Sequence, residues 1–347
     1  MTRFPTSKFA TVVAAAVGAV MMSQAAVAEE WKFAIEEITG SVQDRYAQEF
    51  KRLVEEKTDG EVTVTVYPYG TLGTSADLTE LVTQGALQFA NASPGHLGTL
   101  VQEIQVFSVP YLLSDNNEAN KKVLSESEVI YDTLGSDFEE KGLKLLTMYP
   151  EGEMVWTTNR EIRKPEDFDN FKMRTMVSPM LIEAYKAFGA SPTPMPYGEV
   201  YGGLQLKQID GQVNPIFAIE EMKFYEVTDY MIWAGQQQFT TTVVTGADFY
   251  NGLSDERRKM LDETVAELSD YIFKVQDEYN KERLEKIKKA KPDMKMIELT
   301  DEEKAVFEKA AMQAREKFIE MTGDSGKKIL NDLEAEIKAA EKEAGGN

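Results

Sequence analysis

FKMRTM at residues 171–176 and DGQVNP at residues 210–215 each have the pattern of a short strand that runs into a turn. The first carries Arg174 among apolar neighbours, and the second ends in Asn214. A guanidinium that loses water without gaining an anion is costly, so Arg174 needs an anionic partner. That partner is either an acidic side chain of the protein or the carboxylate of a small ligand. We favour the ligand and keep a structural ion pair as the alternative.

The composition excludes several classes of site. The chain has 347 residues, with 59 acidic and 38 basic side chains, one histidine and no cysteine. Thiol chemistry and cysteine-bound metal are therefore excluded, and the fold must be held by a buried core. The formal net charge of −21 disfavours nucleic acid as a partner. We expect neither a cofactor nor a metal site.

Residues 1–28 have the pattern of a signal peptide. Arg3 and Lys8 precede an apolar run over 9–22, and Ala26-Val27-Ala28 fits a cleavage site. The run is too short to span a bilayer stably. The sequence therefore predicts export to the periplasm.

Strand and helix patterns alternate along the chain, which predicts an α/β fold with largely parallel sheets. We expect strands at 31–35, 61–67, 86–91, 143–149, 154–158, 171–176, 211–214 and 239–245, with helices between most of them. Three prolines and a glycine predict a stiff loop over 191–198. From Ser254 the chain contains no Pro or Gly until Pro292, which predicts a helix of over thirty residues, about 50 Å long. Such a helix would brace two lobes.

The expected division follows from these elements. Residues 29–153 with 243–253 would form lobe I, and residues 154–242 would form lobe II. Residues 254–347 would supply the bracing helix and further helices that pack on both lobes. We expect the chain to cross between the lobes near 150–156 and 236–243.

Four segments resemble those of solute receptors of tripartite ATP-independent periplasmic (TRAP) transporters. They are the strand with Arg174, the segment 210–215, the loop PMPYGEVY over 194–201 and the long helix after Tyr250. The resemblance covers essentially the whole sequence after residue 28. It implies a two-lobed periplasmic receptor, not an enzyme, whose cleft closes on an organic acid and delivers it to the membrane subunits of the transporter. Glu36-Glu37, QFAN at 88–91, Ser93-Pro94-Gly95 and NPIF at 214–217 are most similar to receptors for ectoine.

The expected binding residues follow from this resemblance and from side-chain chemistry. Arg174 would pair with the ligand carboxylate, Asn214 would hydrogen-bond beside it, and Glu37 would accept from a cationic or N–H-bearing part. The full expected set is Glu37, Phe89, His96, Arg174, Tyr197, Asn214, Phe217 and Phe239. Several have an alternative role: a turn cap for Asn214, a solvated turn residue for Glu37 and core packing for Phe217 and Phe239.

Two positions depart from the ectoine-receptor pattern. His96 and Tyr197 stand where such receptors tend to have Phe and Trp, which makes a more polar, hydroxylated carboxylate such as a uronate a credible alternative ligand. An exported hydrolase or lyase using a carboxylate pair, such as Glu220 with Glu221, is a further alternative. We expect a monomer.

Overall fold

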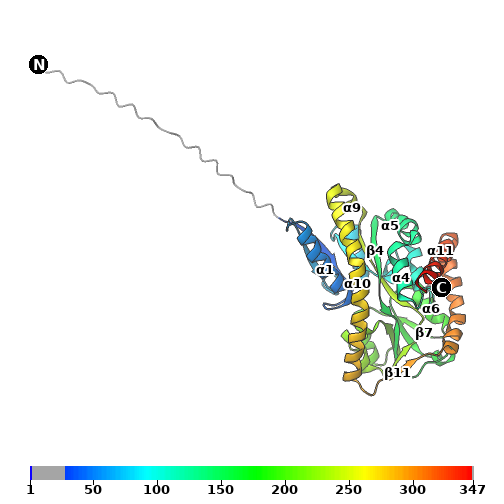
Figure 1. Ribbon diagram of the computed structural model, residues 1–347. Helices are drawn as coiled ribbons and strands as arrows, with labels where there is room; N and C mark the ends of the chain where they lie inside the picture. Colours follow the sequence, from blue (N-terminus) through cyan, green and yellow to red (C-terminus); the bar gives the residue numbers. More distant parts are fainter. Residues whose placement is uncertain (2–27, 346–347) are drawn as a thin grey trace.

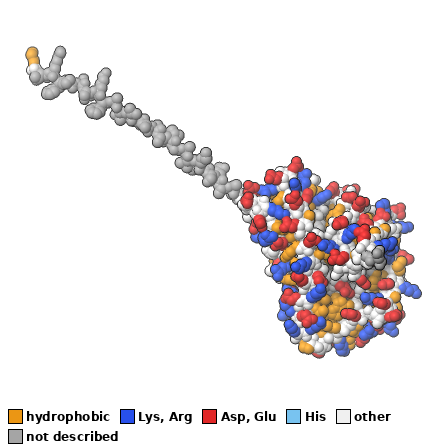
Figure 2. Space-filling model, in the orientation of Figure 1, with side chains coloured by type: hydrophobic (Ala, Val, Ile, Leu, Met, Phe, Trp, Pro, Cys, Tyr) orange, Lys and Arg blue, Asp and Glu red, His pale blue; other side chains and the backbone are white. Residues whose placement is uncertain are grey.

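The computed structural model describes Met1 and residues 28–345. The expected signal peptide therefore lies almost entirely outside the described residues. Among the described residues, no helix combines the length and apolar character needed to cross a bilayer. Acidic and basic side chains are interspersed over the surface in the face shown in Figure 2.

The first sheet has five strands in the order β2-β1-β3-β10-β4. Strand β1 pairs in parallel with β2 and β3, whereas β10 is antiparallel to β3 and β4. The strands are β1 (Glu29–Ala34), β2 (Val62–Tyr67), β3 (Phe89–Ala92), β4 (Leu143–Glu153) and β10 (Gln238–Gly246).

Helix α1 (Val42–Lys57) shows how local sequence builds this lobe. The Ser41 side chain accepts a hydrogen bond from the Asp44 backbone N–H and so caps the helix. Tyr46, Phe50 and Val54 lie on one face and are fully buried, as their helical spacing predicts. The other helical segments of this lobe are α2 (Ser75–Thr83), α3 (Pro94–Leu97), η1 (Gln102–Ser108), α4 (Asn117–Glu126), η2 (Val129–Leu134), α5 (Gly135–Glu140) and α9 (Ala247–Gly252).

The second sheet has six strands in the order β11-β9-β5-β8-β6-β7. The strands are β5 (Val155–Thr158), β6 (Lys172–Thr175), β7 (Ser191–Pro194), β8 (Gly211–Asn214), β9 (Tyr230–Trp233) and β11 (Lys295–Glu298). Around them lie η3 (Pro165–Phe168), α6 (Pro179–Ala187), η4 (Tyr197–Glu199), α7 (Val200–Gln205), α8 (Ile216–Glu221) and η5 (Phe224–Val227).

The expectation of a loop throughout 191–198 is wrong for its first half. Residues 191–194 form β7, which pairs in parallel with β6. Pro192 and Pro194 are tolerated there because β7 is an edge strand and proline can lack a ladder donor at an edge. Strands β9 and β11 were not expected from the sequence.

Two long helices connect the lobes (Figure 1). Helix α10 (Asp255–Ala290) has 36 residues, about 54 Å at 1.5 Å per residue, and packs on α1 and β4 of one lobe and on α8 of the other. The predicted bracing helix is therefore confirmed. Helix α11 (Asp301–Ala344) packs on α4 and α6, and Gly323 (φ 66°) kinks it at the boundary expected between two C-terminal helices.

Two short connections between strands pass from one sheet to the other, and helix α10 makes a third passage, from β10 of the first sheet to β11 of the second. Strand β4 leaves the first sheet at Glu153 and β5 joins the second at Val155, while β9 ends at Trp233 and β10 begins at Gln238. Because β10 pairs with β4 from Gln238 onward, we propose to draw the lobe boundary at these two crossings.

Candidate ligand-binding site between the two lobes

A cavity is lined by side chains from both sheets and their loops. Lobe I contributes residues that follow β1 and β3 and the first turns of α1 and α2, and lobe II contributes the ends of β6 and β8 and the loop after β7. The lining residues are Glu36, Glu37, Gln43, Ser75, His96, Arg174, Met176, Tyr197, Asn214 and Phe239. Six of the eight expected residues are thereby brought together.

Arg174 is the one cation among these lining residues. It lies on β6 and is only 2 % exposed. Its Nε and Nη2 donate to the backbone carbonyl oxygen of Met195, at 3.0 and 2.8 Å. Its Nη1 is buried without a hydrogen-bond partner in the described part of the chain. Within residues 28–345, no acidic side chain lies within ion-pair distance of the guanidinium.

The burial of Arg174 affects the pKa of its guanidinium. Loss of water lowers the pKa of Arg174 to about 10, so the side chain stays cationic at neutral pH. A buried cation whose only protein acceptor is one carbonyl oxygen is poorly compensated. An anion beside Nη1 would supply the missing partner, and a planar carboxylate fits the guanidinium fork.

Asn214 extends the polar wall beside Arg174 at the end of β8. Its Nδ2 donates to Gln212 Oε1 at 2.5 Å, and Gln212 Nε2 donates to Thr157 Oγ1 at 2.7 Å. This chain of bonds fixes the amide, while the side chain still lines the cavity. Asn214 is thus held by its strand neighbours, beyond any role as a turn cap.

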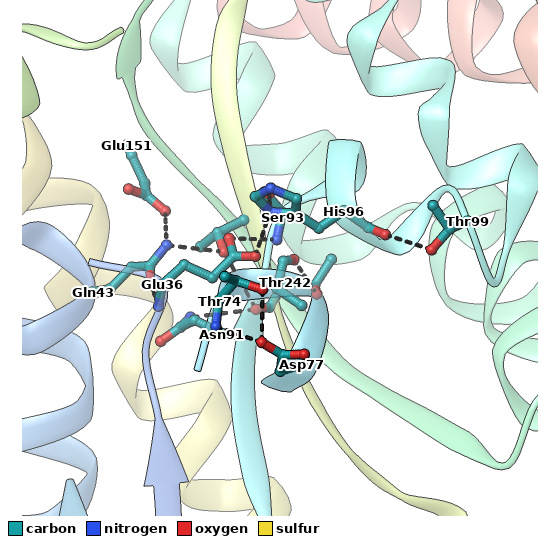
Figure 3. A network of polar contacts seen from close by, with 12 residues as sticks. Glu36, Gln43, Thr74, Asp77, Asn91, Ser93, His96, Thr99, Glu151 and Thr242 are labelled. Atoms are coloured by element: carbon teal, nitrogen blue, oxygen red, sulfur yellow. Dashed lines mark hydrogen bonds and ion pairs between the residues drawn. The ribbon is translucent and has the colours of Figure 1, made fainter. Parts of the chain in front are cut away.

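Glu37 lines the cavity and lies close to two further carboxylates, Glu151 and Glu221, which do not line it. Gln43 links Glu37 to Glu151. Its backbone N–H donates to Glu37 Oε2 at 3.3 Å. Its Nε2 donates to Glu151 Oε1 at 2.9 Å (Figure 3). Burial raises the pKa of Glu37 well above its usual range, and the charge of Glu151 raises it further. Burial likewise raises the pKa of Glu151 to about 7 and that of Glu221 to about 8. These carboxyl groups therefore ionise less readily than exposed ones, and a cationic group beside Glu37 would favour its ionised form.

His96 lies on the single turn of α3 and is oriented by Glu36. Its Nδ1 is 2.7 Å from Glu36 Oε1 and 3.0 Å from Ser93 Oγ. The other oxygen of Glu36 accepts from the Ser93 backbone N–H at 2.8 Å. The imidazole is therefore clamped at one nitrogen.

Tyr197 closes the cavity from lobe II. Its ring meets Tyr69 of lobe I edge to face, with centroids 5.8 Å apart. The Gly198 backbone N–H donates to Tyr69 Oη at 3.2 Å, so the two lobes touch at this point. Burial raises the pKa of Tyr197, which keeps its phenol neutral and able both to donate and to accept.

Comparison with known proteins identifies the family. The model of bacterial extracellular solute-binding proteins, family 7 (DctP), matches residues 33–321. The chain belongs to this family. It is therefore a TRAP-type solute receptor of the periplasm and not an enzyme, as expected from the sequence.

Two curated relatives match this DctP-family receptor over nearly its whole length. The ectoine/5-hydroxyectoine-binding periplasmic protein UehA of Ruegeria pomeroyi is 45% identical over 94% of this chain and 96% of its own. The ectoine-binding periplasmic protein TeaA of Halomonas elongata is 45% identical over 96% of this chain and 97% of its own. The solved structure of the Halomonas elongata ectoine-binding protein superimposes with a TM-score of 0.87, covering 90% of this chain and 100% of that one. The two-lobed fold expected from the sequence is confirmed.

Three phenylalanines were expected to wall the ligand, and the receptor separates them. Phe239 lines the cavity from β10. Phe89 is fully buried in lobe I, where its ring packs on Phe50 with centroids 5.0 Å apart. Phe217 is also fully buried, and its backbone N–H donates to Asn280 Oδ1 at 3.1 Å. Phe89 and Phe217 therefore pack in the core instead of lining the cavity, and core packing was the alternative considered for Phe217.

Four residues of the cavity wall were not among the expected binding residues. Gln43 and Ser75 lie in the first turns of α1 and α2, where a polar side chain is usually a cap or is solvated. Met176 follows β6 by one position, and Glu36 precedes Glu37 in a turn. Glu36 was part of the pair that resembles ectoine receptors, whereas Gln43, Ser75 and Met176 had no comparable signal, because contacts between distant segments leave no local pattern.

Proposed function

We propose that this receptor binds ectoine or 5-hydroxyectoine between its lobes and delivers it to the membrane subunits of a TRAP transporter. Ectoine carries a carboxylate and a delocalised amidinium cation on one small ring. The carboxylate would pair with Arg174, next to Asn214, and the amidinium would face Glu37. The buried Arg174 guanidinium, with an unpartnered Nη1 in the described chain, is the observation that carries the proposal.

The opposite charges of the two walls support a zwitterion over a simple acid. A ligand with only a carboxylate would satisfy Arg174 and bring no cation to the buried pair Glu37 and Glu151, whereas an amidinium beside Glu37 would favour its ionised form. The names of the relatives, 45% identical over almost the entire chain, agree with this choice.

A uronate is the second candidate ligand. It is favoured by the polar groups of His96 and Tyr197, which could bond to sugar hydroxyls. It would leave the acidic wall without a cation, so we rank it after ectoine. We also propose that the receptor acts as a monomer.

A ligand screen tests the proposal. Calorimetric titration and thermal shift with ectoine, 5-hydroxyectoine, glucuronate and succinate should show one site, micromolar or tighter affinity for the ectoines and an upward shift of the unfolding temperature. Saturable binding of glucuronate or succinate without binding of either ectoine would overturn it.

A further inference from the structure

The imidazole of His96 is fixed at one nitrogen and open at the other. Figure 3 shows the Nδ1 side of the ring directed to Glu36 and Ser93, with the bonds of 2.7 and 3.0 Å described above. Glu36 cannot move freely, because it is 5 % exposed and its backbone N–H donates to Gln43 Oε1 at 2.8 Å. The ring is therefore held by a buried carboxylate that is itself held by lobe I.

The remaining nitrogen is the one available to a ligand. His96 Nε2 makes no hydrogen bond within residues 28–345, and the side chain lines the binding cavity. With Nδ1 occupied, Nε2 is the only polar atom of this ring that can meet a bound molecule. A ligand that fills the cavity without a polar atom at this point would remove water from Nε2 and supply no other hydrogen-bond partner.

A hydroxyl group matches this position in either protonation state of the ring. It can donate to Nε2 when the imidazole is neutral, and it can accept from Nε2–H when the imidazole is charged. A methylene group can do neither. The two ligands of the proposed function differ by one such group, since 5-hydroxyectoine has a hydroxyl where ectoine has hydrogen.

We infer that His96 is a specificity-determining residue that favours a hydroxylated cyclic zwitterion, 5-hydroxyectoine, over unhydroxylated ectoine, with Glu36 as its positioning residue. The inference rests on the proposed function. It also explains why the wall of the binding cavity has a polar ring, the His96 imidazole, at this position. Sites that offer a hydrogen bond to a ligand hydroxyl discriminate against the analogue that lacks it, whereas an apolar wall discriminates weakly.

Paired titrations test the inference. We expect the wild-type receptor to bind 5-hydroxyectoine at least about tenfold more tightly than ectoine, which is the scale of one hydrogen bond to a buried partner. His96→Phe should bring the two dissociation constants to within about threefold, mainly by weakening 5-hydroxyectoine. Met176→Leu alters an apolar side chain of the same cavity and should change both constants by the same factor.

The single histidine of the chain supplies a direct readout. Nitrogen-detected NMR of the untagged protein shows one imidazole, and its Nε2 signal should move on addition of 5-hydroxyectoine and move less with ectoine. Glu36→Gln should change the pH profile of that signal in the free protein, which a purely structural Glu36 would not do.

Equal wild-type affinities for the two solutes, with an unchanged ratio in His96→Phe, would overturn the inference and leave the proposed function standing. Absence of binding of either solute to the wild-type protein would overturn both.

Discussion

The carbonyl oxygen of Met195 accepts two hydrogen bonds from the guanidinium of Arg174, at 3.0 and 2.8 Å. Met195 follows β7, the edge strand paired with β6, so one pair of neighbouring strands supplies both the cation and the clamp that orients it. Two of the three guanidinium nitrogens are used in this way. The third, Nη1, has no hydrogen-bond partner in the described part of the chain.

Replacement of Arg174 should strongly weaken ligand binding without loss of the fold. Arg174→Met keeps an unbranched side chain but removes the guanidinium and its charge, so affinity should fall about 100-fold or more because the ligand carboxylate loses a buried partner. The unfolding temperature of the ligand-free protein should not fall, since a poorly compensated buried cation is also removed. Calorimetry and circular dichroism check both parts. Arg163→Met, which removes a half-exposed arginine paired with Glu161 and Glu303, is the matched control and should leave affinity unchanged.

Binding of a zwitterionic solute should release protons. In the free receptor, burial and Glu151 keep the pKa of Glu37 raised, and an amidinium beside Glu37 would favour the ionised form and lower that pKa. Affinity should therefore rise with pH toward neutrality, by at most tenfold per pH unit for each proton released. Titration in two buffers of different ionisation enthalpy gives the number of protons. Glu37→Gln should remove the pH dependence, and an affinity that is flat between pH 5 and 8 in the wild type would contradict this account.

The same carboxylates should make the ligand-free protein less stable as pH rises. The folded-state pKa of Glu151 is about 7, above its ordinary value of 4.5, so the folded protein binds more protons than the unfolded chain between these values. Its contribution to stability is present below pH 4.5 and is lost as pH rises through 7. Glu151→Gln should flatten this decline and raise the free energy of unfolding at pH 8 by on the order of 1–3 kcal/mol. Urea denaturation at pH 5 and pH 8 measures the decline in the free energy of unfolding. An identical decline in Glu151→Gln would contradict its assignment to Glu151.

Asn280 of α10 should be needed to hold the two lobes together. Its Nδ2 donates to the backbone oxygen of Glu151 on β4 at 2.8 Å, and its Oδ1 accepts from the backbone N–H of Phe217 on α8 at 3.1 Å. Asn280→Ala would leave both backbone groups without this partner, so the free energy of unfolding should fall by about 2 kcal/mol. Affinity should fall as well, because Phe217 follows the Asn214 segment by three residues. Lys281 is the next residue and is exposed. Lys281→Ala should change neither the free energy of unfolding nor the free energy of ligand binding by more than about 0.5 kcal/mol.

Local chemistry accounts for what could be predicted from residues alone. An arginine within the apolar strand 171–176 stood out because buried cations require partners, and the structure places it at the cavity with no acidic partner in the described chain. The long α10 was predictable because capping and helix-compatible residues act over neighbouring turns. The strand-turn pattern also pointed to Asn214, and the family resemblance added Glu37 and Tyr197; all three line one cavity with Arg174.

Other features depend on contacts between distant segments. Phe89 and Phe239 have the same side chain on strands of the same sheet, yet one packs in the lobe I core and the other lines the cavity, because strand pairing and twist decide which face each presents. Strand β11 was not predicted. It lies between two long helices in the sequence, and its partner β9 lies more than sixty residues earlier.

The sequence by itself thus determined the α/β class, the bracing helix and the cation that needs an anionic partner, since each follows from side chains and their near neighbours. Only the tertiary structure decided that Gln43 joins Glu37 to Glu151, that Glu36 clamps His96 and that Asn280 ties the lobes together. Such contacts join residues far apart in the chain, and their energies exist only once folding has removed water from between them.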